Sequence, residues 1–439
     1  VKGGMVSVVF TEVLQFVIMT VACIAIGIVA MMKVSPQMLA QVTPNGWDSL
    51  AFGWNLSLDW SAILAQANQR IIEDGWSLFS VFIMLVLFKG ILQSMAGPAP
   101  NFDMQRVLSA RTPSEAAKMS GFVSLVLLVP RYMMITGLAV LALVYFMPAL
   151  NAMGPDVDFE QILPFTLANF IRSGLLGLII AGLLATFRST FAATTNAAPA
   201  YVVNDIYRRY INPDASARTY VRMSYLVSVV FIVLGTAIGL FIPSLNAIVL
   251  WLVSALYGGY TASNLLKWYW WRFNGMAYFA GMSAGILAAI PMMFTDISPL
   301  YGFPFMFAAC LATCIVVSYI SAPDDIEVVK HFYLKTRPWG IWGPIIAAVQ
   351  KDNPNIRPNT EFKKDLGNVV VGIIWHTSLT AAPIFLVIQH WGGLTIATGV
   401  AIISSILLKY FWWDTLSDEP QEQHTLHQPS VYSPAQQGK

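Results

Sequence analysis

The sequence has little charge for its length. Only 11% of its 439 residues are charged, whereas 56% are hydrophobic. A soluble domain typically carries about 25% charged residues, so the composition excludes an ordinary soluble protein. It predicts a polytopic membrane protein whose surroundings are the lipid bilayer. The net charge of +2 is small and its basic residues lie at the edges of apolar runs, so no nucleic-acid partner is expected.

Cysteine and catalytic combinations are scarce as well. The three cysteines, Cys23, Cys310 and Cys314, all lie within apolar stretches, so we expect no structural disulfide. The Cys310/Cys314 pair is expected to pack rather than to bind a metal. No Ser/His/Asp set, metal-ligand spacing or phosphate-binding loop is present, and His376 and His390 are isolated. These absences argue against an enzyme.

Long hydrophobic runs are what the chain has in excess. A membrane helix needs about 20 mainly apolar residues, and ten stretches of the chain meet this requirement. The fold class predicted is therefore all-α, with about ten transmembrane helices and both ends of this chain on one side of the membrane. The candidate spans are residues 6–31, 76–96, 121–146, 174–203, 223–242, 246–266, 276–294, 303–321, 368–388 and 393–413.

The loops differ strongly in their content of Lys and Arg. If the first span runs outward, the outward loops contain only Lys33, Arg70 and Arg172, and most other basic loop residues face inward. Because cytoplasmic loops are enriched in Lys and Arg, both ends of this chain should be cytoplasmic, in a plasma (inner) membrane. We expect a transmembrane domain over residues 1–416 and a polar cytoplasmic tail over 417–439. The inward loop 322–367 contains several prolines and should be partly irregular.

A cluster of hydroxyls occupies the middle of the fourth span. At about 100° per residue, Thr186, Ser189 and Thr190 share one helical face. Uncharged oxygens suit a small hard cation such as Na⁺, because they hold it weakly enough for release. Alternatively, each hydroxyl bonds back to a carbonyl one turn earlier. Arg188, beside the cluster, needs a partner at that depth or lines a path for an anionic solute.

The first span contains a second polar pair. Glu12 and Gln15 lie three residues apart on one helical face, and Glu12 is the only carboxylate of that apolar stretch. A carboxylate buried there is costly unless it meets a cation or a water path. Glu12 therefore either contacts Na⁺ in transit, titrates as a proton carrier, or is solvated near the cytoplasmic interface.

Three motifs together resemble one family. The stretches GGMVSVVFTEVLQ, MQRVLSARTPSEAAKMSG and GLLGLIIAGLLATFRST with VVNDIYRRY are similar to signatures of the sodium/solute symporter family, in the family's order. The stretch LLKWYWWRFNG resembles its Trp-Arg-Asn loop. The resemblance covers residues 1 to about 285.

The resemblance implies a transporter with two inverted five-helix repeats, alternating access and Na⁺ as the coupling ion. Span one then corresponds to the fifth core helix and spans two to six to the second repeat, so the first four core helices are expected upstream. It implies hydroxyl ligands for Na⁺ at Ser189 and Thr190, a backbone oxygen ligand at Thr186, and an ion exit path at Glu12 and Gln15.

The resemblance also suggests where a solute binds. Family geometry places the pocket between spans two and six, which makes Gln93, Ser94, Ser254 and Tyr257 the candidate solute contacts. The solute is expected to be a small organic molecule such as a sugar or a carboxylate. Lys89 and Arg131, two further cations within spans, fit an acidic solute or pair locally.

Three functions follow from these features. The preferred one is Na⁺-coupled symport of a small organic solute. A proton-coupled transporter of the same architecture, with Glu12 as the titrating group, is the first alternative. A membrane sensor built on a transporter module is the second, although the short polar tail after Asp418 is too small for a signalling kinase.

Overall fold

A computed structural model of the chain describes residues 4–49, 58–61, 68–69, 79–96, 107, 109–153, 159–241, 258–291 and 299–416. The described residues are almost entirely helical. Their single β-type pairing is an isolated parallel bridge between Trp270 and Ile341. The all-α prediction is therefore confirmed.

Each of the ten predicted spans overlaps a helix. These helices are α1 (Gly4–Lys33), α4 (Phe79–Ala96), α6 (Pro113–Leu141), α9 (Ser173–Ala200), α10 (Ala217–Leu240), α12 (Gly258–Tyr269), α13 (Gly275–Ala289), α14 (Pro299–Ile320), α17 (Phe362–Val387) and α18 (Trp391–Phe411). Two of them continue through π-helical turns: α6 through η1 (Ala142–Phe146) into α7 (Met147–Ala152), and α9 into η4 (Tyr201–Ile211). The arrangement as an inverted repeat stays a prediction.

Shorter helices lie between the long ones. They are α2 (Pro36–Val42), η3 (Phe159–Gln161), α8 (Ile162–Phe170), α15 (Ile326–Thr336), α16 (Gly343–Asp352) and η7 (Trp413–Thr415). The loop 322–367, expected to be partly irregular, thus contains two helices. Irregular backbone is found around its prolines, between α15 and α16 and before α17.

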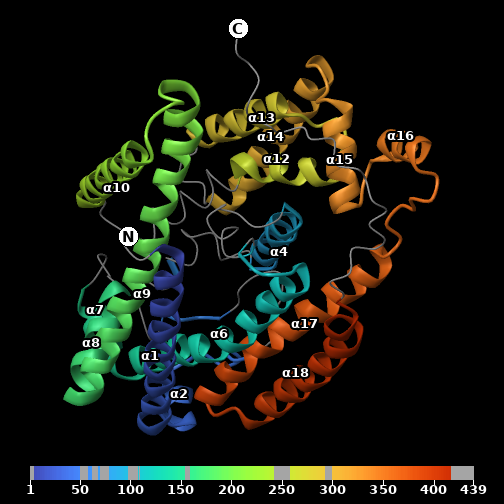
Figure 1. Cartoon of the computed structure of the whole chain (residues 1–439). Coiled ribbons are helices and arrows are strands. Elements are labelled where there is room, and N and C mark those ends of the chain that lie inside the picture. The colour runs from blue at the N-terminus through green and yellow to red at the C-terminus, as the bar shows by residue number, and fades with distance from the viewer. Residues whose placement is uncertain are drawn as a thin grey trace.

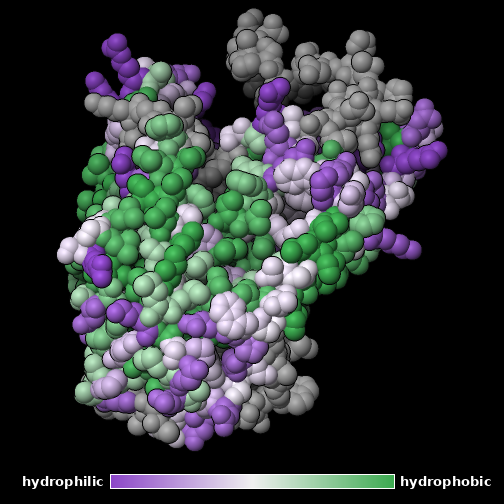
Figure 2. All heavy atoms as spheres, turned by 90° about the horizontal axis from the view of Figure 1, so that it is seen from below, coloured by the Kyte–Doolittle hydropathy of each residue, from purple (hydrophilic) through white to green (hydrophobic). Residues whose placement is uncertain are grey.

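The outer surface of the helices is strongly apolar. Among the described residues, six helical segments are long and apolar enough to cross a membrane, and Ser173–Arg188 and Gly275–Ala289 form shorter apolar helices. On the face shown in Figure 2, hydrophobic side chains form a broad area and hydrophilic ones gather toward its edges. Large side chains such as Phe10, Leu240 and Ile320 are exposed. This surface suits lipid rather than water.

The helices fall into two packed groups. Among the described helices, the extensive contacts join α1, α6, α9, α10, α17 and α18 with one another (the α1 group), and α4, α12, α13 and α14 with one another (the α12 group). Figure 1 shows the α12 group above the lower helices of the α1 group, with α9 and α10 at one side.

Helix α1 is the centre of its group. Small residues allow close approach: a Cβ on Gly27 would lie 3.0 Å from Cβ of Met133, and one on Gly137 would lie 3.2 Å from the Ile26 carbonyl oxygen. Ala22, Ile26 and Ala30 are buried there. Helices α1 and α6 therefore pack backbone to backbone, which only small side chains at the crossing permit.

The C-terminal end of α1 is capped by side chains from η1 and from the α17–α18 turn. The last carbonyls of a helix have no intrahelical partner. The Tyr145 hydroxyl donates to the Lys33 carbonyl at 2.7 Å, and Nε2 of Gln389 donates to the carbonyls of Met31 and Val34 at 3.1 and 2.9 Å. Gln389 itself has a left-handed backbone with φ of 59°. Its side chain fixes the α17–α18 turn onto α1.

The α12 group contains a close backbone-to-backbone crossing of two helices. A Cβ on Gly285 of α13 would lie 2.5 Å from the Gly259 Cα of α12. Beside it, the Ser263 hydroxyl lies 3.4 Å from Sγ of Cys310 and 3.2 Å from Sγ of Cys314. All three cysteines of the chain are free and buried. Cys310 and Cys314 thus pack in a helix interface, as predicted from the sequence.

The Gly285 contact gives a test of this packing. We expect Gly285→Ala to lower the stability by about 1–3 kcal/mol, because the added methyl group forces α12 and α13 apart. Gly235→Ala on α10 is the matched control: it has open space around it, so only the better helix propensity of Ala remains. Thermal unfolding of the purified protein measures both. Equal melting temperatures for the two variants would contradict the close crossing.

Candidate functional site

The predicted ion-binding residues lie on two antiparallel helices that touch. Ile179 of α9 packs in one buried cluster with Ala22 and Ile26 of α1. A Cβ on Gly182 would lie 3.3 Å from Sδ of Met19. Later residues of α9 therefore meet earlier residues of α1, so the two helices run in opposite directions at this contact.

This register aligns the two polar clusters. Thr186 and Thr190 follow Gly182 by about one and two helical turns, and Gln15 and Thr11 precede Met19 by about one and two turns. Because the helices are antiparallel, the hydroxyl stripe of α9 lies at the same depth as Glu12 and Gln15 of α1. The sequence placed both clusters in spans, but it gave no information on their relative depth.

Gln15 has an unsatisfied oxygen at this depth. Its side-chain Oε1 is buried and has no hydrogen-bond partner among the described residues. Leaving a buried acceptor without a donor costs about 1–3 kcal/mol. An amide oxygen is also a good ligand for a hard cation. The observed environment of Gln15 therefore fits a Na⁺ ion passing between α1 and α9.

The described hydroxyls of the α9 stripe are also compatible with contact to Na⁺. Oγ1 of Thr186 donates to the Gly182 carbonyl at 3.0 Å, which is the back-bonding that the sequence left open. A hydroxyl that donates in this way keeps its oxygen lone pairs for a cation. Thr186 and Thr190 are exposed, and the side chain of Ser189 lies outside the described part of the chain.

The chemistry of the site is that of neutral oxygens. The described residues contain no group of three or more His, Cys, Asp or Glu side chains that could hold a metal ion. An alkali ion does not require one, because hydroxyl, amide and carbonyl oxygens hold it with little fixed charge. The residues present suit a weakly held, exchangeable Na⁺ better than a tightly bound transition metal.

The candidate solute contacts lie on the other group of helices. Nε2 of Gln93 on α4 is buried without a hydrogen-bond partner among the described residues. The Ser94 hydroxyl is exposed and donates to the Gly90 carbonyl at 2.9 Å. Ser254 and Tyr257 lie outside the described residues. Because α4 packs on α12 and α14, the structure does not bring Gln93 into contact with the hydroxyl stripe.

The intramembrane arginines have no visible partner. Arg131 and Arg188 are exposed, and within the described residues neither forms an ion pair or a hydrogen bond. The partner expected for Arg188 is therefore not found in the described part of the chain. Its guanidinium is free to meet lipid, water or an anion.

The structure has a cavity elsewhere that the sequence did not reveal. It has a volume of about 230 Å³ and lies near the C-terminal end of α1, between α2, the turn at residues 43–48 and the α17–α18 turn. Asp48 and His390 line it, but none of the predicted site residues does. The capping role of Gln389 also had no local sequence signal, because it depends on a contact between distant segments.

Comparison with known proteins relates the chain to sodium-dependent transporters. A model of the "Sodium:solute symporter family" matches residues 1–285. The chain is 25% identical over 265 residues to a sodium/glucose cotransporter of Vibrio parahaemolyticus, covering 55% of this chain and 48% of that protein. It is 23% identical over 331 residues to the sodium/sialic acid symporter NanT of Aliivibrio fischeri, covering 73% of this chain and 60% of that protein.

A solved structure shares the fold. The chain resembles a Na⁺-coupled sialic acid symporter in its substrate-bound outward-open state, with a TM-score of 0.54 and 18% identity. The match covers 73% of this chain and 64% of that chain. The chain therefore spans about half to two thirds of the length of these relatives, and the similarity of helical architecture is consistent with the packing described above.

The unsatisfied oxygen of Gln15 leads to a prediction. We expect Gln15→Met to raise the melting temperature without Na⁺, because it removes a buried acceptor that has no donor. The same variant should lose the additional stabilisation that Na⁺ gives by binding to the folded state. Thermal unfolding over a Na⁺ titration, with K⁺ or choline at constant ionic strength, measures both effects.

Gln93→Met is the matched control for this experiment. It removes the other buried, unpartnered glutamine amide, on α4, and should also stabilise the protein. It should leave the response to Na⁺ intact. If Gln15→Met keeps the full Na⁺ response, Gln15 is not part of the ion site.

Proposed function

Because the chain belongs to the sodium:solute symporter family, we propose that it forms part of a secondary active transporter driven by Na⁺. In this proposal Na⁺ moving down its gradient drives uptake of a small organic solute by alternating access. The carrying observation is the buried, unpartnered Oε1 of Gln15 at the depth of the α9 hydroxyl stripe.

The proposed ion site combines the two helices. Ser189 and Thr190 contribute hydroxyl oxygens, and Thr186 contributes its backbone oxygen. Gln15 and Glu12 line the path by which the ion leaves toward the cytoplasm. Each ligand lowers the cost of the conformation that binds the other, so Na⁺ and solute raise each other's affinity by the same factor.

The proposed placement in the membrane follows from charge. Both ends of this chain are cytoplasmic, with residues 1–416 forming the transmembrane domain in the inner membrane and 417–439 a polar tail. The proposed architecture is two inverted repeats of five helices, of which the chain contributes the fifth helix and the second repeat. The distribution of Lys and Arg among the loops supports this orientation.

The proposed solute is a sugar or an acidic relative of a sugar. The related proteins are named for glucose and sialic acid, and Gln93 offers an unpartnered amide donor toward such a molecule. Ser94, Ser254 and Tyr257 complete the proposed contacts. The exposed, unpaired Arg188 favours a carboxylate on the solute, since a guanidinium binds a carboxylate through two parallel hydrogen bonds.

Substitution of the hydroxyls tests the ion site. We expect Ser189→Ala and Thr190→Ala each to weaken the apparent Na⁺ affinity about tenfold, the effect of losing about 1.4 kcal/mol. Thr377→Ala on α17 is the matched control, because it removes a hydroxyl that donates to the carbonyl one turn earlier but lies outside the stripe. Na⁺-dependent solute binding by the full-length protein measures all three. Normal Na⁺ dependence in both variants, or uptake that follows pH without Na⁺, would reject the assignment.

Arg188 tests the class of solute. We expect Arg188→Met to weaken uptake of acidic sugars about tenfold or more while leaving neutral sugars unaffected. The melting temperature should not fall, because the variant removes an unpaired charge that costs about 3 kcal/mol at the middle of a membrane helix. Arg218→Met, at the cytoplasmic start of α10, is the control. A lower melting temperature with unchanged uptake would instead mean that Arg188 pairs within the protein.

A further inference from the structure

The α15–α16 segment docks firmly onto the end of α12. The Ile341 amide donates to the Tyr269 carbonyl at 2.7 Å, and the Trp271 amide donates back to the Ile341 carbonyl at 3.2 Å. The indole of Trp342 donates to the Trp268 carbonyl at 3.1 Å. Three hydrogen bonds thus join a connecting segment to the α12–α13 turn, whose residues are distant in sequence.

This docking requires a glycine. Gly340 has a φ of 119°, a conformation that residues with a side chain rarely adopt, and a Cβ there would collide with the Tyr269 backbone. Gly343, three residues later at the start of α16, has open space around it. Substitutions of Gly340 and Gly343 therefore distinguish the loss of the close contact with Tyr269 from the general effect of replacing a glycine.

The segment is a packed unit rather than a loose loop. Tyr333, Trp342, Ile345 and Val349 form its buried core, and Trp271 of the α12–α13 turn packs against them. A loop without internal packing would not transmit a force between its ends. This one has a core of its own, shared with the α12 group.

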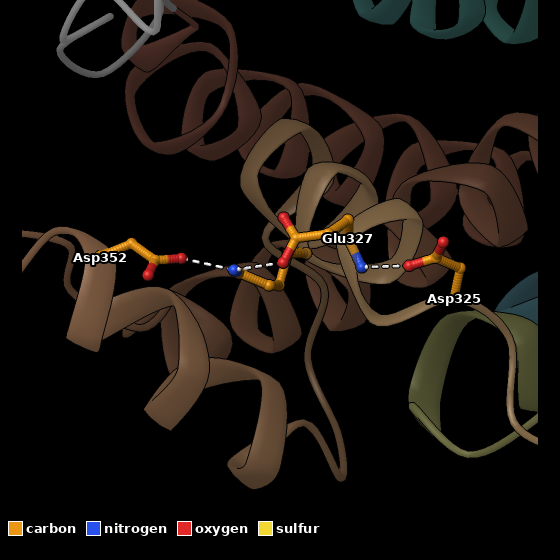
Figure 3. Close-up of polar contacts among 4 residues, drawn as sticks. Asp325, Glu327 and Asp352 are labelled. Carbon is orange, nitrogen blue, oxygen red and sulfur yellow. Dashed lines mark hydrogen bonds and ion pairs between the residues drawn. The ribbon is translucent and has the colours of Figure 1, made fainter. Parts of the chain in front are cut away.

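An ion-pair bridge also joins α15 to α16. Nζ of Lys330 on α15 lies 2.5 Å from Oδ2 of Asp352 at the end of α16 and 2.8 Å from Oε1 of Glu327, with only 14% of its side chain exposed. Asp325 caps the start of α15 by accepting from the Glu327 amide at 2.9 Å (Figure 3). Asp352, and to a smaller extent Glu327, raises the pKa of Lys330, so its charge persists throughout the physiological pH range.

The other end of the segment contacts α17, which belongs to the α1 group. Within the segment, Nδ2 of Asn359 donates to the carbonyl of Arg337 at 3.1 Å and holds the stretch before α17 against the end of α15. The rings of Trp339 and Phe362, the first residue of α17, meet edge to face with centroids 5.0 Å apart. The segment therefore makes specific contacts with both groups of helices.

From these contacts we infer that residues 322–361 form a strap that ties the cytoplasmic end of α12 to that of α17. The strap limits how far the α12 group and the α1 group separate on that side. This inference rests on the proposed function for its meaning, because alternating access requires groups of helices to move relative to one another. It assigns residues 322–361 a positioning role in transport without placing them in the ion or solute site.

A distance measurement tests the strap. Spin labels at Tyr319→Cys on α14 and Leu366→Cys on α17, two exposed positions, report the separation of the two groups in the full-length protein. The three native cysteines are replaced by Ala for this experiment, and the protein is reconstituted in lipid vesicles. A third spin label, at Lys351→Cys on α16, is measured in a separate sample. Its mobility reports whether α16 stays docked on α12.

We expect Gly340→Ala to release α16 and to increase the population with the longer α14–α17 separation about fivefold. Gly343→Ala should match the parent protein in both measurements. Asn359→Ala, which removes the bond that holds the stretch before α17 against Arg337 and leaves the α12 contacts intact, should produce a shift in the same direction. This second variant keeps the test decisive if Gly340→Ala folds poorly.

Two results would overturn the strap. One is an unchanged α14–α17 separation after the Lys351 label shows that α16 has been released. The other is a docked α16 in Gly340→Ala, since docking would then not depend on the glycine. Both measurements are made without Na⁺, so they test the strap independently of ion binding. The proposed function is tested separately, by the Na⁺ titration of Gln15→Met and its parent, and its failure would show there as a missing response to Na⁺.

Discussion

A buried oxygen in an apolar surrounding needs a donor or a cation, and one such oxygen lies on α1 near its contact with α9. A helical backbone satisfies its own polar groups, so the polar atoms that still need a partner are those of side chains. At this contact Gln15 has an acceptor without a donor among the described residues, and Thr186 uses its hydroxyl proton on its own helix. Both residues are left with oxygen lone pairs. An excess of acceptors over donors is the local condition that favours a small cation.

The two ends of α1 are used differently for the same physical reason. At the C-terminal end the last carbonyls accept from Tyr145 and Gln389, and Gln389 has an unfavourable left-handed backbone there. Toward the N-terminal end the polar oxygen of Gln15 has no partner among the described residues, so stabilisation there can come from a ligand. Under the proposed function, an ion bound near Gln15 acts on the contact with α9 while the other end of α1 is held by these hydrogen bonds.

The features of the fold that depend on helical periodicity and hydropathy could be predicted from the sequence. The presence of a helix at each predicted span and the packing of Cys310 and Cys314 follow from local composition, and the shared face of Thr186 and Thr190 follows from helical geometry. Six helical segments of the described residues are long and apolar enough to cross a membrane, so the number of ten spans stays a prediction. The depth of Gln15 relative to Thr186 could not be predicted, because it depends on the α1–α9 register, which is set by a glycine at 182. The contact of Gln389 with α1 had no signal either, since it joins residues more than three hundred positions apart. The prolines of 322–367 led us to expect partly irregular backbone, and helices α15 and α16 in this stretch were not predicted.

The division into two groups of helices gives the strap its physical importance. The oxygen-rich contact belongs to the α1 group, whereas Gln93 belongs to the α12 group. Under the proposed function, coupling between an ion and a solute then requires the two groups to respond to each other. Among the described helices the direct contacts between the groups are sparse, and sparse contacts store little coupling energy. A docked segment with its own core, which contacts α12 at Gly340 and α17 through Trp339, can carry such energy over a distance. Its hydrogen bonds reach backbone atoms of α12 and of the α12–α13 turn, and its core includes the side chain of Trp271. The strength of this anchor therefore depends both on the close approach of Gly340 to Tyr269 and on the packing of that indole.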